Sequence, residues 1–234
     1  MSRETYRALA TDFDATLADR GRVAPETLAA LDRLRAHGRH LFLVTGRELP
    51  DLRRVFGRLD LFERVIAENG GLLYRPATNE EIPLAMPPPA ALVRRLRALD
   101  LSPLSIGRVV IATTEPHHRL LTTTIAELGL DHRLIFNKGS VMALPAGISK
   151  ASGLAVALAE TGIAAGEVVG IGDAENDRDF LAACGCAVAV ANALAELKER
   201  CDLVTVGEAG AGVVELIERM LAGDLPARAR FNAR

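Results

Sequence analysis

The sequence lacks a strong charge of either sign, a long apolar run and enough cysteines for a disulfide framework. Its 28 lysines and arginines nearly balance 30 aspartates and glutamates, so the formal net charge is −2. A charge this small argues against broad electrostatic binding to nucleic acid or to a membrane surface. No stretch of about 20 consecutive apolar residues is present, which argues against a membrane-spanning helix. Residues 1–7 are polar and lack the apolar centre of a signal peptide, so we expect a cytoplasmic protein.

The cysteines are too few and too closely spaced for a disulfide framework. There are three, an odd number, and Cys184 and Cys186 are separated by one residue. A metal site at this pair would need two more soft ligands nearby, and the sequence shows none. We therefore expect buried apolar cysteines.

The sequence does contain enough apolar residues for a sizeable core, since 49% of its 234 residues are hydrophobic. Short apolar runs alternate with helix-like segments at both ends of the chain. Residues 7–11, 41–44 and 65–67 are strand-like, with a helix-like segment after each of the first two. Such a β-α-β-α-β order indicates a parallel sheet with helices on both faces. The same pattern resumes near Lys150. We expect an α/β fold with a Rossmann-like parallel-sheet core.

A different pattern interrupts this core. Prolines crowd residues 83–89, as at a domain crossing, and a small set of helix-like and strand-like segments follows. We expect a core domain at residues 1–78 and 146–223, with a small α+β cap domain inserted at residues 79–145. The tail at residues 224–234 has few apolar residues and is interpreted as disordered or as a linker.

Polar residues follow the predicted strands of the core. Asp12 and Asp14 follow the first strand, Thr45 follows the second, and Asp173 follows the strand at residues 168–171. Ligands of open α/β sheets bind at the carboxyl ends of strands, so we expect these side chains to meet at one edge. Carboxylates suit Mg²⁺, and a phosphoryl group in transfer needs a metal, a lysine and small donors. The pattern therefore predicts Mg²⁺-dependent phosphate chemistry.

These residues can divide the work of phosphoester hydrolysis. Asp12 would attack phosphorus and form an aspartyl-phosphate. Asp14 would protonate the leaving oxygen and then deprotonate the attacking water. Asp173 would bind the metal together with Asp12. Thr45 would donate a hydrogen bond to the phosphoryl oxygens, and Lys150 would neutralise Asp12 and the phosphate.

Five further residues have more than one interpretation. Asp177 would hold either a metal-bound water or the catalytic lysine. Arg47 either contacts substrate or is solvated, and Asn69 either orients the loop or substrate or simply forms a turn. Asn137 and Lys138 lie at a polar tip between two apolar strands of the insert. That tip is either a plain hairpin turn or a cap loop that covers the substrate.

Four motifs occur in order along the chain, with a fifth match between the second and third. They are Asp-Phe-Asp-Ala-Thr-Leu at 12–17, Val-Thr-Gly-Arg at 44–47, Glu-Asn-Gly-Gly at 68–71, Gly-Ile-Ser-Lys at 147–150 and Gly-Asp-Ala-Glu-Asn-Asp at 172–177. With these motifs the chain resembles the haloacid dehalogenase superfamily of phosphohydrolases from about residue 7 to residue 221. It is most similar to the Cof-type branch, subfamily IIB, in which a C2-type cap is inserted between the second and third motifs.

The resemblance implies a set of site residues and a metal. Mg²⁺ is the implied cofactor. Asp12 is implied as the nucleophile, and Asp14 as the acid and base whose backbone carbonyl also binds the metal. Asp173 is implied as a further metal ligand, and Asn176 and Asp177 as residues that complete the metal and phosphate surroundings.

The chain departs from the family pattern at Ala15, where glycine is usual. If this position needs a positive φ, alanine costs about 1 kcal/mol there. We expect a small adjustment of the loop and retained activity, because every charged group of the motif is present.

The leading hypothesis is a phosphatase of small phosphorylated metabolites, such as a sugar phosphate or a phosphoglycolate-like compound. The alternatives are a phosphosugar mutase of the same superfamily, a phospho-accepting signalling domain and a sugar-nucleotide transferase. The predicted partner is a small phosphoester, with no nucleic acid and no membrane. The sequence leaves the oligomeric state open.

Overall fold

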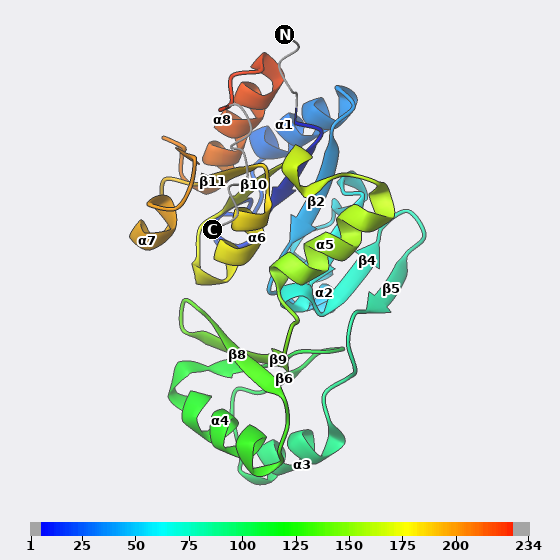
Figure 1. Ribbon diagram of the computed structural model, residues 1–234, viewed down its shortest axis with the longest axis vertical. Helices are drawn as coiled ribbons and strands as arrows, with labels where there is room; N and C mark the ends of the chain where they lie inside the picture. Colours follow the sequence, from blue (N-terminus) through cyan, green and yellow to red (C-terminus); the bar gives the residue numbers. More distant parts are fainter. Residues whose placement is uncertain (1–5, 227–234) are drawn as a thin grey trace.

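The computed structural model describes residues 6–226 and contains two β-sheets, one above the other (Figure 1). The larger sheet has the strand order β12-β11-β10-β1-β2-β3-β4-β5. Its strands are β1 (Ala8–Thr11), β2 (His40–Val44), β3 (Arg64–Ala67), β4 (Leu72–Arg75), β5 (Glu80–Pro83), β10 (Val168–Gly172), β11 (Cys186–Ala189) and β12 (Leu203–Val204). The strands from β12 to β3 are parallel, which confirms the predicted fold class.

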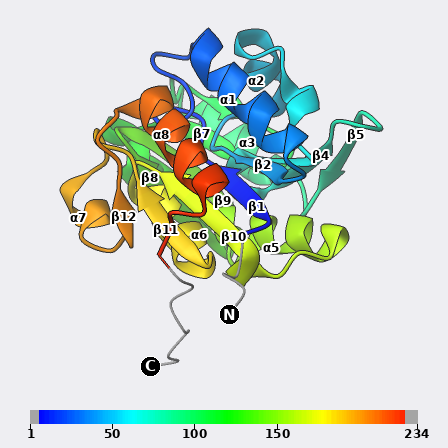
Figure 2. The ribbon, with the colours of Figure 1, turned by 90° about the horizontal axis from the view of Figure 1, so that it is seen from above.

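Helices cover both faces of the larger sheet. Figure 2 shows α1 and α8 side by side on one face and α5 and α6 on the other. The helices are α1 (Pro25–Ala36), α2 (Leu49–Val55), α5 (Lys150–Thr161), α6 (Arg178–Ala183), α7 (Ala195–Lys198) and α8 (Ala209–Ala222). With both faces covered, β1, β10 and β11 are buried along their whole length, as their apolar sequences require.

The smaller sheet has the order β6-β7-β9-β8 and carries two helices on one face. Its elements are α3 (Ala90–Ala98), β6 (Ser105–Ile106), β7 (Ile111–Thr114), α4 (His118–Glu127), β8 (His132–Asn137) and β9 (Ser140–Pro145). Leu92, Leu96, Leu121 and Ile125 of the helices pack on Ile111, Val141 and Ala143 of the strands. The opposite face of this sheet is turned toward the larger sheet (Figure 1).

We call residues 6–83 and 150–226 the core and residues 90–145 the cap. Our boundary at residue 79 is wrong in one respect, because β5 pairs with β4 in an antiparallel hairpin of the larger sheet. Because β5 is hydrogen-bonded to β4 along its whole length, the larger sheet continues to Pro83. Short 3-10 helices are η1 (Leu59–Leu61), η2 (Glu68–Gly70), η3 (Glu115–His117), η4 (Ala165–Glu167) and η5 (Glu175–Asp177).

Three other predictions from the sequence can be compared with the structure. Cys184 and Cys186 are buried without a disulfide, and Cys201 is half-buried and also free. Most of the tail that we interpreted as disordered, residues 227–234, lies outside the described residues. Between residues 6 and 226, no helix combines the length and the hydropathy that crossing a bilayer requires.

Candidate active site

The residues that follow β1, β2 and β10 meet at one edge of the larger sheet. Thr11 is paired with both Ile171 and Leu43, so the three strands end at the same level. The backbone N–H of Asp12 donates to the carbonyl of Ile171 at 3.0 Å, which continues the ladder past the strand end. The register thus places Asp12 between the segments that carry the second and fourth motifs.

Lys150 lies between two buried aspartates. Its Nζ donates to Asp12 Oδ1 at 2.5 Å and to Asp177 Oδ1 at 2.5 Å. All three side chains are almost inaccessible to solvent. Burial alone would lower the pKa of Lys150, but the attraction of the two carboxylates outweighs it and raises this pKa above its usual range. Lys150 is therefore a permanent positive charge at the centre of the site.

Local sequence fixes the position of this lysine. Ser149 caps α5, because its Oγ accepts from the N–H of Ser152 at 3.2 Å and Ser152 Oγ accepts from the N–H of Ser149 at 2.9 Å. Gly70, with φ +99°, lies against this cap: a Cβ there would be 1.9 Å from the carbonyl oxygen of Ser149. The first turn of α5 therefore begins directly behind the end of β3, with Lys150 pointing to Asp12.

The aspartates outnumber the cations that balance them. Burial raises the pKa of Asp12 well above its usual value, and the negative charges of Asp177 and Asp173 act in the same direction, while Lys150 opposes them. Burial also raises the pKa of Asp173, although hydrogen bonds from Lys138 and Thr16 oppose that rise. Such mutual repulsion among carboxylates is relieved when a cation binds between them.

The donor set fits a hard divalent metal ion. Oxygen atoms of Asp12, Asp173 and Asp177 lie within 4.8 Å of one another. Asp177 is already committed, because its Oδ2 accepts from the N–H groups of Asp173 at 2.8 Å and Ala174 at 2.9 Å, and its Oδ1 accepts from Lys150. Asp12 and Asp173 are thus the residues suited to direct contact with a cation, and Asp177 supports the loop that carries Asp173.

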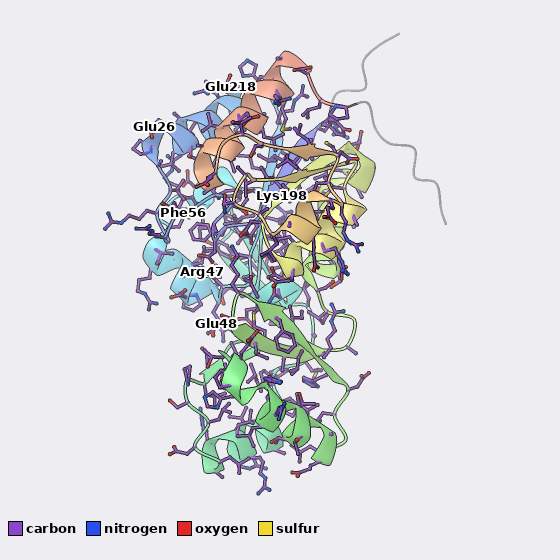
Figure 3. The ribbon with its side chains drawn as sticks, turned by 90° about the vertical axis from the view of Figure 1, so that its left-hand side faces the viewer. Glu26, Arg47, Glu48, Phe56, Lys198 and Glu218 are labelled. Atoms are coloured by element: carbon purple, nitrogen blue, oxygen red, sulfur yellow. The ribbon has the colours of Figure 1, made fainter. Side chains whose placement is uncertain are left out.

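Asp14 forms a bidentate ion pair with Arg47. Arg47 Nε and Nη2 donate to the two oxygens of Asp14, each at 2.8 Å, and Arg47 also pairs with Asp51. The Asp14 side chain is 41% exposed, so it is accessible to solvent and to a ligand. Arg47 and Glu48, labelled in Figure 3, lie where the core and the cap meet. Arg47 therefore holds Asp14 at the entrance to the site.

A cavity of about 650 Å³ lies between the core and the cap. Asp12, Asp14 and Arg47 line it from the core, and Asn137 and Lys138 line it from the cap. The ammonium of Lys138 reaches across and pairs with Asp173 Oδ2. The polar tip between β8 and β9 is thus a hairpin turn that also faces the site.

The remaining predicted residues lie around this centre. Thr45 is buried, and its Oγ1 accepts from the N–H of Arg47 at 3.1 Å, which leaves its own proton free to donate. Asn69 contacts Asn176 and not Asp12: Asn176 Nδ2 donates to Asn69 Oδ1 at 2.9 Å. These two asparagines line a second cavity of about 240 Å³ together with Lys150.

Sequence reasoning missed several contacts of the site. Thr16 Oγ1 donates to Asp173 Oδ1 at 3.0 Å, and its place in the first motif was the available signal. Met142 lies against Asn69 from the cap, and no feature of the sequence marks it. Glu68 is buried beside the site and joins core to cap; the match at 68–71 includes it but did not indicate this contact, because a glutamate is normally exposed.

Comparison with known proteins decides the family. The profile described as haloacid dehalogenase-like hydrolase matches residues 9–97 and 104–217. The chain belongs to this family. A phosphoglycolate phosphatase from Methanothermobacter thermautotrophicus is 30% identical over 226 residues, which cover 92% of this chain and 99% of that protein.

Solved structures show the same fold. A haloacid dehalogenase-like hydrolase from Bacteroides thetaiotaomicron has a TM-score of 0.77 at 22% identity and covers 92% of this chain and 100% of its own. A subclass IIB sugar phosphatase of this superfamily has a TM-score of 0.72 at 18% identity, with 91% and 98% covered. The resemblance to the Cof-type branch is thereby confirmed, and the chain is a phosphatase.

Proposed function

We propose that the chain is a Mg²⁺-dependent phosphatase that hydrolyses small phosphorylated metabolites through an aspartyl-phosphate on Asp12. The observation that carries this proposal is the buried cluster of Asp12, Asp173 and Asp177 around Lys150 at the carboxyl edge of the sheet. The cluster combines a nucleophile, a cation site and a fixed positive charge, which are the groups that phosphoryl transfer requires.

The reaction proceeds in two displacements. In the first, a carboxylate oxygen of Asp12 forms a bond to phosphorus as the bond to the leaving oxygen breaks, and Asp14 gives that oxygen a proton. In the second, water attacks phosphorus, Asp14 takes a proton from the water, and the bond to Asp12 breaks. Arg47 holds the ionised Asp14 by two hydrogen bonds, and one of them must open for Asp14 to carry the proton that it gives up in the first step.

Asp12 and Asp173 would hold the Mg²⁺, together with the backbone carbonyl of Asp14. When bound, the ion supplies positive charge that balances the phosphoryl oxygens. Lys150 adds a second positive charge, and Thr45 contributes a hydroxyl whose proton is free to donate. Asn176 and Asp177 keep the loop after β10 in place through their contacts with Asn69 and Lys150.

The substrate is a small anionic phosphoester, with phosphoglycolate and sugar phosphates as the leading candidates. Three cations that line the cavity between core and cap could turn to an anionic substrate, although each is paired with an aspartate here: Arg47 with Asp14, Arg54 with Asp51 and Lys138 with Asp173. A cavity of about 650 Å³ has room for a phosphorylated sugar as well as for a two-carbon acid. The relative that carries the name phosphoglycolate phosphatase favours the acid. Action on such metabolites agrees with the cytoplasmic location that the composition predicts.

A panel of phosphorylated metabolites, ranked by kcat/KM with and without Mg²⁺, tests this proposal. We expect release of inorganic phosphate from a small phosphorylated acid or sugar, and none from the Asp12→Asn variant. Accumulation of an isomeric phosphosugar without free phosphate would favour the mutase instead. Turnover that is unchanged in excess chelator would contradict the proposed role of Mg²⁺.

A further inference from the structure

Glu68 is a buried carboxylate that joins the core to the cap. It begins η2, directly after β3, and is 1% exposed. Its Oε1 accepts from the N–H of Arg108 at 2.9 Å, and its Oε2 accepts from the N–H groups of Val109 at 2.8 Å and Val110 at 3.0 Å. A charge removed from water needs donors of this kind, and hydrogen bonds to an ionised acceptor are the stronger ones.

The three donors belong to the turn between β6 and β7, residues 107–110, and the turn fits closely around the carboxylate. A Cβ at Gly107 would be 2.6 Å from Glu68 Oε2, and a Cβ at Gly71 would be 2.8 Å from the Cβ of Val109. Glycine is therefore needed on both sides of this contact. The backbone of Glu68 has φ +53°, which is unusual for a residue with a side chain. Strained backbone of this kind persists where the surroundings over-determine it.

The backbone of the same segment is tied to the catalytic loops. The N–H of Glu68 donates to the carbonyl of Arg47 at 2.9 Å, and the N–H of Asn69 donates to the carbonyl of Thr45 at 3.0 Å. The side chain of Asn69 then contacts Asn176 in the loop after β10. A single short segment thus touches the second motif, the fourth motif and the cap.

The sheet of the cap connects this turn to the tip that carries Lys138. Strand β7 leaves the turn and pairs with β9, with Ile111 opposite Ala143 and Thr114 opposite Ser140. Strand β9 pairs in turn with β8 up to Asn137, next to Lys138. The turn and the tip therefore lie at opposite ends of one hydrogen-bonded sheet.

We propose that Glu68 is a positioning residue that docks the cap turn on the core and thereby sets where Lys138 stands above the catalytic aspartates. The expected effect of Glu68 on KM rests on the proposed function. The docking of the cap turn on the core rests on the contacts alone. Other contacts between cap and core, such as Ser105 with Glu48 and Arg108 with Glu81, join an exposed cap side chain to a half-buried glutamate. Exposed pairs hold a domain weakly, whereas a buried carboxylate is costly to displace from its donors.

Amide hydrogen exchange tests the structural part. In Glu68→Gln, the amide group brings its own N–H toward backbone donors, so we expect the N–H groups of residues 108–110 to exchange about tenfold faster or more. Glu81→Gln is the matched control, because it removes the same charge from a half-buried glutamate that pairs with the exposed Arg108 of the same turn. Equal exchange in wild type, Glu68→Gln and Glu81→Gln would overturn the inference.

Gly107→Ala tests the same contact without altering Glu68, and Gly57→Ala, where a Cβ meets nothing within 4 Å, is its control. For both Glu68→Gln and Gly107→Ala we expect KM for the preferred metabolite to rise about tenfold while kcat on a small aryl phosphate stays within about twofold. A parallel loss of kcat on both substrates, at unchanged KM, would show general damage and contradict a positioning role. A wild-type chain without phosphatase activity would count against the proposed function, and the exchange result would still decide the docking.

Discussion

The core and the cap contribute to the site in opposite ways. The core supplies Asp12, Thr45, Lys150, Asp173 and Asp177, none of them more than 4% exposed. The cap supplies Lys138, whose side chain is 42% exposed, and Asn137, which is half-buried. Buried groups held by several partners cannot move without a large cost, whereas an exposed lysine on a turn can. In the proposed function, the core would therefore carry out the chemistry on the phosphate, and the cap, whose side chains move more easily, would recognise the rest of the substrate.

The charged groups of the core and of the cap also differ in how deeply they are buried. At the centre of the core, Lys150 contacts Asp12 and Asp177, and all three side chains are buried. Removing Lys150 would leave two buried carboxylates uncompensated in a dry environment. In the cap, Lys138 can exchange Asp173 for water or for an anionic substrate. Mutations in the core should therefore affect every substrate, and mutations in the cap only some.

The sharpest test of this contrast is Asp12→Asn. An amide has nearly the same shape as the carboxylate but is a poor nucleophile, so we expect kcat to fall by roughly 10⁴-fold or more for every substrate. The fold should survive, and Tm should not fall, because the substitution removes one of several repelling buried carboxylates. Phosphate release and a thermal melt measure the two effects. Near-normal turnover, free of wild-type contamination, would remove Asp12 as nucleophile.

The cation site in the core gives the next largest effect. We expect activity to vanish in excess chelator and to return with Mg²⁺. Because Asp173 is a direct ligand in the proposal, Asp173→Ala should weaken Mg²⁺ binding by at least about 100-fold. Titration calorimetry measures this without turnover, with the exposed Glu199→Ala as control. Unaltered Mg²⁺ affinity in Asp173→Ala would mean that the ion binds elsewhere.

Lys138→Ala should produce a selective loss, since it changes only the cap. We expect kcat/KM for the preferred anionic metabolite to fall about tenfold, mostly through KM, with little change for a generic aryl phosphate. Arg94→Ala, an exposed charge on cap helix α3, serves as the control. If both substrates lose equally, Lys138 acts on the catalytic aspartates and the contrast between core and cap is too simple.

The same contrast separates what the sequence predicts from what it does not. Both ends of helix α5 have signals that are local in the sequence, a serine cap at Ser149 and a left-handed glycine at Gly162. The aspartates after β1 and β10 were placed together because strand ends of a parallel sheet share one edge. These features depend on neighbours in sequence or on the general geometry of the fold.

The missed features depend on partners distant in sequence. Strand β5 was overlooked because Glu80 to Pro83 has no apolar alternation, and only pairing with β4 makes it a strand. The contact of Glu68 with residues 108–110 spans about forty positions, and although Glu68 belongs to the match at 68–71, nothing at residues 108–110 marks them as its partner. The pair of Lys138 with Asp173 requires the cap to be placed on the core, which local patterns do not specify.

Ala15, in the core loop after β1, allows a smaller test, which concerns backbone strain. Its φ is +60°, so the condition under which we expected a cost at this position is met. Asn192 holds the loop by donating to the carbonyl of Ala15 at 2.8 Å. Ala15→Gly should relieve strain of about 1–2 kcal/mol, less about 0.4–1 kcal/mol for the freer unfolded chain, and so raise Tm by about 2 °C. Thermal unfolding measures this. A lower Tm would show that the loop has adapted fully to alanine.

The smallest expected effect is the loss of a partly exposed ion pair of the core. Such a pair should contribute as little to stability as an exposed charge of the cap. Glu160 on α5 accepts from Arg75 and from Arg64, and hydrogen bonds from Arg75 are the main cause that lowers the pKa of Glu160. A carboxylate whose pKa is lower in the folded protein than in the unfolded chain stabilises the fold when the pH is above its unfolded pKa. That stabilisation is lost as the pH falls through its folded pKa. Glu160→Gln should therefore lower Tm at pH 7 by only about 1 °C, because partly exposed pairs are weak. The difference from wild type should shrink below about pH 4, near the ordinary pKa of glutamate. Melting curves of both proteins at pH 7 and pH 4 measure it, and a difference that grows in acid would reverse the sign of this argument.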